Sequence, residues 1–573
     1  MKTTTRISEL ERKIESLEAA FEAQTALSET QQATIATQAE LIAEQRALIK
    51  FYEEQFKISQ RRRFGSSSEQ SPDQLSFENM FNEPEDQADL SLPEPIYEEI
   101  SYQRKKRVGK REEDLADLPV ERIEYELPEA ERGCPECGTL MPDIGVTVRD
   151  ELKIIPPQVI HVEHAVHAYG CPKCKNDTDS SAQIVRADSP SPLIAGSMAS
   201  ASAVAHIVSQ KYVNGIPLYR QEKGLIYDGV VISRQTMANW LIKCTQMYLA
   251  AVYYRLYEML LSEDLVNADE TTLQVLHEPG RDAKTKSYEW LYRTGSHAKH
   301  HIILYNYQET RSQEHPRAFL SGFKGYLQTD GYQVYHNLPS GIISVGCWAH
   351  ARRPWEELYE TLDKDKRDGS IAERGLLYIN LLFWFEHEYR DLSPEERYEQ
   401  RLKYSKPVSD DYYIWIKTLS PLPKSKLGEA VGYSISQREY LENVYLDGRL
   451  ELSNNISERA IKPFVQGRKV WLFSNTPNGA ESSSILFSLV ETAKENNLNP
   501  YQYIKYLLET LPNMSTGELD MVLPWNASLP DVCRVPVKQS NKKPHKPMYS
   551  GKNGPLNQAL QKLRAKYREG DST

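Results

Sequence analysis

The chain has 573 residues, enough for several domains of about 100–200 residues each, and its 40% hydrophobic and 26% charged residues are typical of a soluble globular protein. Its formal net charge of −11 argues against a general attraction of the whole chain to nucleic acid, but DNA binding depends on local basic patches, which are present. The sequence has neither a run of about 18 apolar residues nor a signal-peptide core, so we expect no membrane span and no membrane partner.

Residues 1–60 are predicted to form one long coiled-coil helix. Apolar residues recur every seven positions along one seam, whereas the second seam is apolar only at Leu10 and Leu17 and then consists of glutamines. This pattern favours a parallel homodimer or a higher homo-oligomer with a loose register. A lone helix docked on its own domain is the alternative.

The segment 61–115 contains two basic clusters separated by an acidic stretch rich in Pro and Ser. The acidic stretch is predicted to be a disordered linker. The clusters can bind DNA phosphates or can be solvated chain ends. Their candidate DNA-binding residues are Arg61, Arg62, Arg63, Lys105, Lys106 and Arg107.

Two Cys-Pro-x-Cys pairs mark residues 116–190 as a zinc-ribbon domain, with a stretch of strand-like composition between the pairs. Each pair can place two thiolates on one tetrahedral ion, so we expect a structural Zn²⁺. A redox role is less favoured because no thioredoxin-like βαβ pattern surrounds either pair. Seven cysteines, four of them in these pairs, suit a reducing compartment. The zinc ligands are Cys134, Cys137, Cys171 and Cys174.

A helix-turn-helix-like DNA-binding domain is predicted over residues 191–262. One helix begins at Pro217 and ends near Asp228, and Ser233 caps the next helix after a short turn that contains Gly229. This layout is typical of a helix-turn-helix, although an ordinary helical hairpin has the same pattern. The candidate DNA contacts are Arg220, Arg234 and Gln235.

A multidomain α/β protein is therefore expected, with a ribonuclease-H-like catalytic core divided between residues 263–355 and 449–515. An all-helical insertion separates the two parts at 356–448, and a basic C-terminal tail follows at 516–573. The core begins with strands at 264–276, 287–293 and 301–307, followed by a helix near residue 317 and strands at 325–330 and 342–350. In a ribonuclease-H-like sheet the first and fourth strands are neighbours, so Asp269 and Asp330 can meet.

Asp269 is unusual because buried strands rarely carry a carboxylate at mid-length. Leu265, Leu273 and Val275 share its side of the strand, which we therefore expect to be the more enclosed side. Glu270 is expected to point away from the site. A solvated position at a fraying strand end is the alternative for Asp269, and a simple turn is the alternative for Asp330.

Cleavage of a phosphodiester by two metal ions requires several carboxylates, and two Asp with one Glu can hold Mg²⁺ or Mn²⁺. Asp269, Asp330 and Glu458, which lies on a later helix, meet this requirement. His350 is expected to support the strand end or to contact phosphate. Basic residues expected to neutralise the DNA strand being cut are Arg352, Arg353, Arg459, Lys462, Arg468 and Lys469.

Taken together, these features resemble the transposases of the insertion sequence 66 family over nearly the whole chain. The resemblance rests on the paired Cys knuckles together with Arg61-Arg62-Arg63-Phe64-Gly65-Ser66-Ser67-Ser68-Glu69, Pro217-Leu218-Tyr219-Arg220-Gln221-Glu222, Ala268-Asp269-Glu270-Thr271, Thr329-Asp330-Gly331-Tyr332, Cys347-Trp348-Ala349-His350-Ala351-Arg352-Arg353, and Asn454-Asn455-x-x-Glu458-Arg459-Ala460 followed by Gly467-Arg468-Lys469.

The resemblance implies a DDE-type transposase with Asp269, Asp330 and Glu458 as its triad. It also implies binding to the element's terminal inverted repeats and to target DNA, accessory proteins encoded beside it, and a bacterial cytoplasmic protein that associates with the nucleoid through DNA. Lys462 stands where the family is expected to have Arg, which keeps the charge but loses the planar fork for phosphate. A DNA-binding repressor with an inactive catalytic domain is the competing hypothesis, and the three intact carboxylates argue against it.

Overall fold

The computed structural model describes residues 158–170, 184–336, 338–535 and 555–568, together with isolated positions before residue 158. The predicted coiled-coil helix lies outside the described residues except for a few helical positions near its centre. The linker and the four paired cysteines also lie outside them. Contacts divide the chain into two units, one centred on Val252–Thr492 with 555–568, and the other comprising the described residues up to Ala251 and from Ala493 to 535. No helix in the described ranges is long and apolar enough to cross a membrane.

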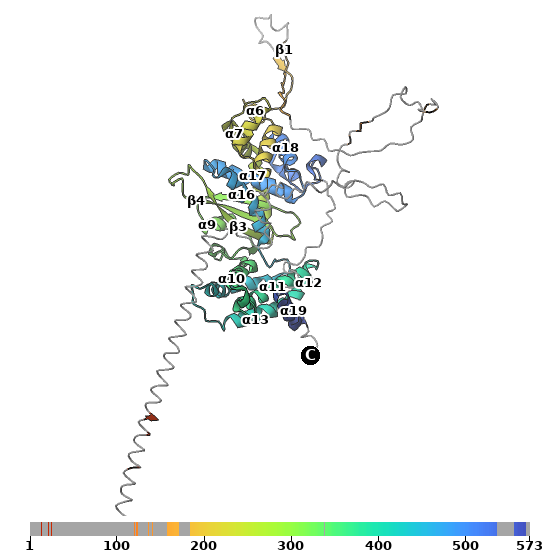
Figure 1. Cartoon of the computed structure of the whole chain (residues 1–573). Helices are drawn as coiled ribbons and strands as arrows, with labels where there is room; N and C mark the ends of the chain where they lie inside the picture. Colours follow the sequence, from red (N-terminus) through yellow and green to blue (C-terminus); the bar gives the residue numbers. More distant parts are fainter. Residues whose placement is uncertain are drawn as a thin grey trace, which may run out of the picture. The chain divides into compact units, whose positions relative to one another are not determined.

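The first unit is built on a five-stranded sheet with the order β5-β4-β3-β6-β7 (Figure 1). β3 pairs antiparallel with β4, and β4 pairs antiparallel with β5, whereas β6 and β7 run parallel to β3. These strands confirm the ones predicted from the sequence. Their bounds are β3 Leu265–Gln274, β4 Lys286–Thr294, β5 Ile303–Gln308, β6 Gly325–Gln328 and β7 Ile342–Val345.

Strand β3 changes its surroundings halfway along its length. Its residues from Leu265 to Ala268 are buried, whereas those from Asp269 to Thr272 are only partly buried. The parallel pairing with β6 ends at Asn267, although the antiparallel pairing with β4 continues to Gln274. The sheet therefore opens on the β6 side where the two acidic residues of β3 begin. Asp269 lies in mid-strand, so the solvated strand-end alternative for it is wrong.

Helices α16 (Asn455–Trp471) and α17 (Pro477–Glu495) pack on the sheet, with α16 in contact with β3 and β4. Hydroxyl groups of α17 also protect the outer edge of β5. Ser488 Oγ accepts the Tyr305 N–H at 2.8 Å, and Thr492 Oγ1 accepts the Ile303 N–H at 3.0 Å. Unpaired strand edges invite unwanted pairing, so these bonds close an edge that β5 would otherwise expose.

A helical region lies between β7 and α16, as the sequence predicts, and its aromatic core surrounds Trp355 and Tyr412. Gly375 allows α11 to cross Trp355 closely, because a Cβ there would lie 2.3 Å from the indole ring. Ser393 caps the start of α12, with a complete capping box to Glu396. The main helices are α10 Trp348–Thr361, α11 Ile371–Tyr389, α12 Pro394–Gln400, α13 Lys406–Ile416 and α14 Lys426–Ser436.

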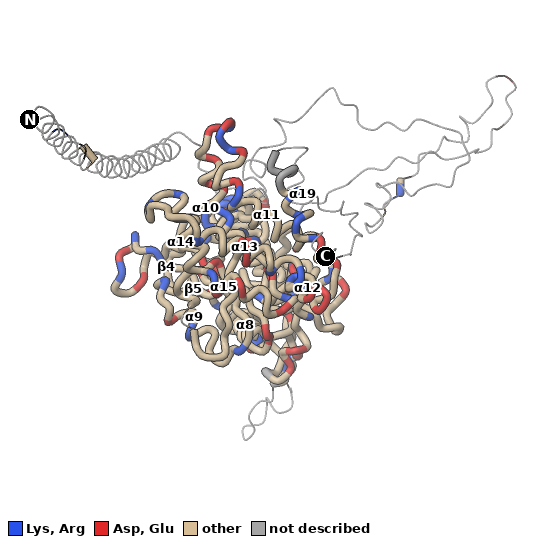
Figure 2. Tube along the Cα trace, turned by 90° about the horizontal axis from the view of Figure 1, so that it is seen from below, with Lys and Arg blue, Asp and Glu red and all other residues tan. Residues whose placement is uncertain are grey.

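Helix α19 (Pro555–Arg568) lies in the predicted basic tail and packs against α11. Basic residues of α19 are paired with acidic residues of this unit: Arg564 with Glu388 at 3.3 Å and Lys566 with Asp411 at 3.1 Å. Figure 2 shows Lys and Arg residues interspersed with Asp and Glu around α19 and α12. The described part of the tail therefore neutralises acidic groups of its own chain.

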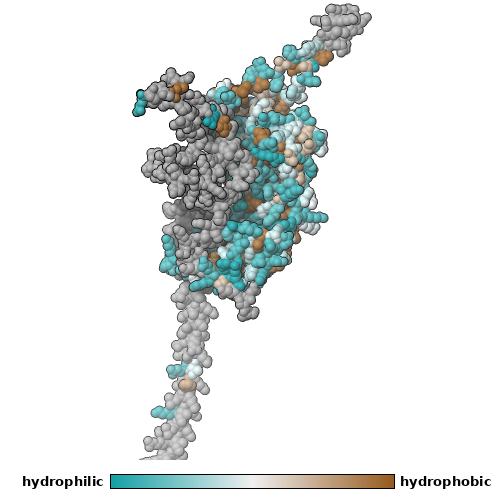
Figure 3. Space-filling view, turned by 90° about the vertical axis from the view of Figure 1, so that its right-hand side faces the viewer, coloured by the Kyte–Doolittle hydropathy of each residue, from teal (hydrophilic) through white to brown (hydrophobic). Residues whose placement is uncertain are grey.

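The second unit contains a small two-stranded sheet and a group of helices. β1 (Ala168–Gly170) and β2 (Ile184–Arg186) pair antiparallel. Helix α18 (Pro500–Thr510) packs on α5 (Ala201–Val208), whose buried face includes Val204 and Ile207. Apolar residues are scattered among hydrophilic ones on the face shown in Figure 3, and they form no single large apolar surface among the described residues there.

Candidate catalytic carboxylate site

The register of the sheet brings Asp269 and Asp330 to the same level. Asn267 on β3 is the parallel partner of Gln328 on β6, and each aspartate follows its strand's paired residue by two positions. Neighbouring strands lie about 4.8 Å apart, and residues two positions apart share a face. The two carboxyl groups therefore start from adjacent backbones where the strands separate.

Glu458 is brought to this position by a network of buried amide groups at the start of α16. Asn454 donates from Nδ2 to the Ala268 carbonyl at 2.8 Å, and its Oδ1 accepts from Asn267 at 3.2 Å. Asn267 also donates to Gln328 at 3.3 Å, so the network joins β3, β6 and α16. Glu458 lies in the first turn of α16, one helical turn beyond Asn454.

The three carboxyl groups interact electrostatically. Burial raises the pKa of Asp269 well above its ordinary value, and the charges of Glu270, Asp330 and Glu458 raise it further. A hydrogen bond from the Glu270 N–H to Asp269 Oδ1, at 2.8 Å, acts in the opposite direction. The site thus gathers several carboxylates. Such a concentration of negative charge is unfavourable in a closed core unless a cation or hydrogen bonds compensate it.

The turn that carries Asp330 is held by local and tertiary contacts. Asp330 Oδ1 accepts the Tyr332 N–H at 3.0 Å, and the Tyr433 hydroxyl on α14 donates to the Asp330 carbonyl at 2.8 Å. Gly331 has φ = +89°, and a Cβ there would lie 2.8 Å from the Tyr433 hydroxyl. Asp330-Gly331 is therefore a turn, which was the alternative interpretation from the sequence. Its contacts fix this turn between the sheet and the helical region.

Glu270 does not simply leave the site, as strand alternation suggests. Its side chain is only 1% exposed and is paired with Arg311. Burial and the charge of Asp330 raise the pKa of Glu270, whereas the Tyr335 hydroxyl and Arg311 lower it. Glu270 therefore points to the other face, as strand alternation predicts, but stays within electrostatic reach of both aspartates.

His350 lies next to Glu458, with Nδ1 3.9 Å from Glu458 Oε1. Burial by itself lowers the pKa of His350, but Cys347 and Asp330 outweigh this effect and raise the pKa to about 9. The imidazole faces the acidic site from α10.

Comparison with known protein families shows which family the chain belongs to. Residues 196–482, half of the chain, match the family described as "Transposase IS66 family". The chain belongs to the IS66 family of transposases. This matched region contains Asp269, Asp330 and Glu458.

Three further IS66 models match other parts of this transposase. The zinc-finger binding domain of transposase IS66 matches residues 131–175, the IS66 C-terminal element matches 488–525, and the model "Transposase C of IS166 homeodomain" matches 52–123. The zinc-finger match spans all four paired cysteines, so the prediction of a zinc-binding region is confirmed. The DNA-binding role predicted for the chain is supported by the same matches.

Two similar proteins come from Sinorhizobium fredii (strain NBRC 101917 / NGR234), where they are named uncharacterized proteins y4qI and y4jD. The first is 30% identical over 498 residues, covering 82% of this chain and 87% of its own length. The second is 30% identical over 434 residues, covering 72% of this chain and 82% of its own.

A divalent metal ion is implied for the IS66 transposase by its DDE family domain. Within the described residues, no three His, Cys, Asp or Glu side chains lie close enough together to hold a metal ion as they are placed. The donors still suit a hard cation, because they are carboxylate oxygens whose mutual repulsion raises the pKa of Asp269. Among these candidate metal ligands, Glu458 lies beside His350, and its side chain is 23% exposed.

The basic residues predicted around the transposase site fall into two groups. Arg352 is 7% exposed and donates to Asn380 at 2.8 Å and to Glu356 at 2.7 Å. Arg468 donates to Thr272 at 2.8 Å and so ties α16 to β3. These two positions favour structural roles. The other four are partly or fully exposed at the surface: Arg353, Arg459, Lys462 and Lys469.

The predicted helix-turn-helix lies in the second unit as α6 (Leu218–Tyr227) and α7 (Arg234–Cys244). Ser233 caps α7 as expected, accepting the Thr236 N–H, and Glu222 on α6 accepts the Arg234 N–H at 3.0 Å. These contacts connect the two helices. Arg220, Arg234 and Gln235 are all exposed and available to a nucleic acid.

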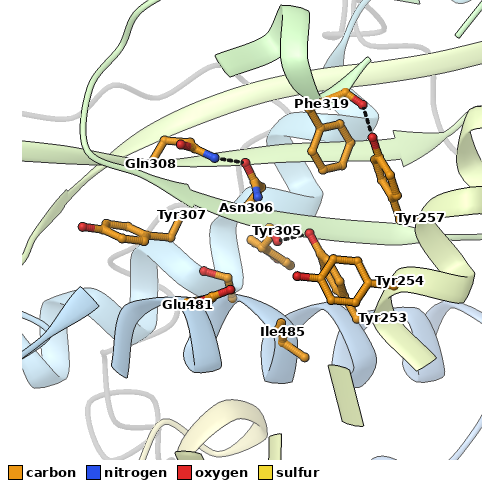
Figure 4. A pocket seen from close by; sticks show the side chains of 11 residues that line it. Tyr253, Tyr254, Tyr257, Tyr305, Asn306, Tyr307, Gln308, Phe319, Glu481 and Ile485 are labelled. Atoms are coloured by element: carbon orange, nitrogen blue, oxygen red, sulfur yellow. Dashed lines mark hydrogen bonds between the residues drawn. The ribbon is translucent and has the colours of Figure 1, made fainter. Parts of the chain in front are cut away.

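A pocket of about 360 Å³ lies at the outer edge of β5 and contains none of the predicted site residues. Figure 4 shows that its lining comes from β5, from α9 (Glu314–Phe319), from the tyrosines of α8 (Ala250–Leu261) and from α17, which contributes Glu481 and Ile485. The Tyr257 hydroxyl donates to the Phe319 carbonyl across it. The pocket is therefore separate from the acidic residues at the end of β3.

Two functional positions were missed by sequence reasoning. Asn454 was named only as part of a motif, yet its side chain, which makes no capping hydrogen bond, binds β3. Arg311 was not singled out at all, although it is the ion-pair partner of Glu270. The paired asparagines before Glu458 were a usable signal, because helix caps do not require two of them, whereas Arg311 gave no signal in the sequence.

Proposed function

We propose that this IS66 transposase cuts and joins DNA at a site formed by Asp269, Asp330 and Glu458 on a ribonuclease-H-like sheet. The observation that supports this most directly is that Asp269 and Asp330 each lie two residues beyond the last paired residues, Asn267 and Gln328, of the parallel strands β3 and β6. Helix α16 is tied to β3 through Asn454 and, through Asn267, to β6. The order β5-β4-β3-β6-β7, antiparallel on one side and parallel on the other, supports the ribonuclease-H-like assignment.

Asp269, Asp330 and Glu458 would hold Mg²⁺ or Mn²⁺, which supplies an activated oxygen nucleophile and stabilises the leaving oxygen. In the first step, water attacks a phosphodiester at the element end, and the 3′-oxygen leaves as a hydroxyl. In the second step, this 3′-hydroxyl attacks a phosphodiester of target DNA, whose own 3′-oxygen leaves.

The surrounding side chains orient the reacting groups and the DNA. His350, whose Nδ1 lies 3.9 Å from Glu458 Oε1, would help to hold that carboxylate in place. Arg353, Arg459, Lys462 and Lys469 are exposed cations that would bind phosphates of the strand being cut. Arg352 and Arg468 would act indirectly, by fixing α10 and α16.

The remaining parts of the chain would bind and align the DNA ends. α6 and α7 would contact the terminal inverted repeats through Arg220, Arg234 and Gln235. The four paired cysteines would bind a structural Zn²⁺, and the basic clusters in 61–115 would contact phosphates. The helix of residues 1–60 would join copies of the chain, and small proteins encoded by the same element would assist it.

A cleavage and strand-transfer assay tests this proposal. The purified full chain is incubated with DNA that carries the element ends, with Mg²⁺ or Mn²⁺, and compared with Asp269→Asn. We expect metal-dependent cleavage by the wild type and a loss of at least ~10³-fold in Asp269→Asn, because metal assistance lowers the barrier by several kcal/mol. Glu439→Gln, an exposed acid on α15 (Arg438–Glu442), serves as the matched control and is expected to cleave normally.

Two results would contradict the proposal. Undiminished cleavage by Asp269→Asn would remove Asp269 from the chemistry. Specific binding to the element ends without any cleavage by the wild type would favour the competing function, a DNA-binding repressor with an inactive catalytic domain.

A further inference from the structure

The strongest unassigned feature near the site is the ion pair between Arg311 and Glu270. Arg311 Nε donates to Glu270 Oε1 at 2.9 Å, and Nη2 of the same guanidinium makes a second, shorter contact with that oxygen. The other carboxylate oxygen of Glu270 accepts the Tyr335 hydroxyl at 2.5 Å. Both oxygens of a nearly buried carboxylate are therefore bonded, as burial of a charge requires.

Each partner of Glu270 leads to the turn that carries Asp330. The Arg311 guanidinium carbon lies 3.6 Å from the centre of the Tyr332 ring, and the Tyr332 N–H donates to Asp330 Oδ1. Tyr335 lies at the end of the same short segment, and its fully buried ring packs edge-on against Trp290 of the sheet. Arg311 and Glu270 thus hold both ends of the segment 330–335.

The opposite side of this turn is already fixed. The Tyr433 hydroxyl donates to the Asp330 carbonyl. It lies so close to Gly331 that a side chain at this position would collide with it. The turn is therefore held between α14 on one side and the Arg311–Glu270 pair on the other. Loss of the pair would free one side only, which would move Asp330 without unfolding the helical region.

We propose that Arg311 and Glu270 form a clamp that positions the Asp330 turn, so that they are positioning residues for the chemistry at Asp269 and Asp330. The clamp consists of Arg311, Glu270, Tyr332 and Tyr335. The catalytic consequence rests on the proposed function, whereas the restraint on the turn does not. A displacement of a reacting group by about 1 Å can cost ~10²-fold in rate, so a restraint of this kind is large enough to matter.

The burial of Glu270 separates this clamp from an ordinary surface ion pair. Exposed pairs contribute little, whereas removing one member of a buried pair leaves an uncompensated charge. The Glu270 side chain is 1% exposed and that of Arg311 is 39% exposed. Lysine would keep the charge at position 311 but would lose the flat guanidinium that stacks on Tyr332.

Hydrogen–deuterium exchange tests the restraint without any reference to activity. In the full chain, Arg311→Met is expected to speed exchange of the amides of 331–336 by at least ~10-fold, because these amides are protected only while the turn is closed. Peptides from α17 are expected to exchange as in the wild type. Arg317→Met removes an exposed arginine on α9 and is the matched control, with no expected change at 331–336.

Cleavage and DNA binding are then measured on the same variants. Arg311→Met is expected to lower kcat by ~10–100-fold with unchanged DNA affinity and unchanged salt dependence, and Arg311→Lys to recover only part of that loss. Because the two residues act as one unit, Arg311→Met combined with Glu270→Gln is expected to be no slower than Arg311→Met alone.

The outcomes separate the clamp from the proposed function. Unchanged exchange at 331–336 in Arg311→Met would overturn the clamp, whatever the activity. A loss of DNA affinity and of salt dependence with unchanged exchange would also overturn it, because Arg311 would then be a phosphate contact. If exchange rises but the wild type cuts no DNA under any metal condition, the restraint stands and the proposed function fails.

Discussion

Asp269 on β3 and Glu289 on β4 lie on the same face of the sheet but have different neighbours. Asp269 on β3 is the partner of Leu291, and Thr271 is the partner of Glu289 on β4, so both acids point to the side covered by α16 and α17. Burial raises the pKa of both. Glu289 is fully buried where the strands are antiparallel, and its pKa rises to about 8, with Ser484 of α17 offsetting part of the effect.

What distinguishes Asp269 is its neighbours. The charges of Glu270, Asp330 and Glu458 add to the effect of burial, whereas no other carboxylate raises the pKa of Glu289. Asp269 also lies where β6 stops pairing with β3, at an opening of the sheet. The comparison teaches that burial alone marks a structural acid, and that a cluster of acids at the separation of two parallel strands marks a candidate site.

The largest expected effect sharpens this contrast directly. Asp330→Asn is expected to lower metal-dependent DNA cleavage by ~10³-fold, because one of the proposed ligands is lost. Glu289→Gln is expected to leave the cleavage rate close to that of the wild type, since it removes a buried acid of the same face outside the cluster. Equal losses in the two variants, measured in the same cleavage assay, would break the comparison.

The second prediction concerns how stability depends on pH. Because the pKa of Glu289 is raised to about 8 in the folded state, the folded protein keeps a proton that the unfolded chain releases above pH ~4.3. The stability from this group is complete below the unfolded pKa and is lost as pH rises toward 8. Glu289→Gln, which does not titrate, is expected to lose less stability between pH 5 and pH 8, by an amount on the order of 3 kcal/mol.

Thermal unfolding at pH 5 and pH 8 measures this difference. The wild type and Glu289→Gln would show parallel pH dependence if Glu289 were ionised in the folded protein. That result would mean that Glu289 is a charged acid with a compensating partner. The difference between the surroundings of Glu289 and those of Asp269 would then be smaller.

The third prediction concerns the amide network that brings Glu458 to the site. Asn454→Ala removes the side-chain donor to the Ala268 carbonyl and one of the two acceptors of Asn267, which is expected to cost about 1–3 kcal/mol of stability and to lower cleavage. Asn455→Ala, at the next and partly exposed position, is the control and is expected to have a smaller effect. Urea unfolding and the cleavage assay are the measurements, and equal effects of the two variants would contradict the network's role.

The smallest expected effect lies at the outer edge of the antiparallel side. Ser488→Ala removes the hydroxyl that accepts the Tyr305 N–H, which is expected to cost about 1 kcal/mol and to leave cleavage unchanged. Ser483→Ala, whose hydroxyl donates to Gly479 within the same helix, is the control. Faster exchange of the Tyr305 amide in Ser488→Ala alone would confirm that α17 protects this edge.

Much of the secondary structure could be predicted from local patterns. The alternation of apolar residues located β3, and Pro217 and Ser233 marked helix starts that the structure confirms. These signals work because capping and side-chain alternation act between residues that are close along the chain. The acidic positions Asp269 and Asp330 could be singled out for the same reason, since a carboxylate in the middle of an apolar strand, or just after the end of one, is visible in the sequence.

The partners of these positions could not be predicted in the same way. Asn454 bonds to Asn267, which lies 187 residues earlier in the chain. Arg352 was predicted to contact DNA, but it is buried against Asn380, which lies 28 residues later on another helix. Strand alternation correctly turns Glu270 from the face of Asp269. It does not reveal that Arg311 and Tyr335 return to Glu270 from other segments.

The sequence by itself determined the strands, the helix starts, the paired cysteines and the membership of a transposase family. Only the tertiary structure decided which side chains surround Asp269 where β3 and β6 separate, which arginines are buried and which segments contact the turn that carries Asp330. The physical reason is that helix and strand signals arise from neighbours within a few residues, whereas the sheet register and the amide network depend on packing between segments far apart in the chain.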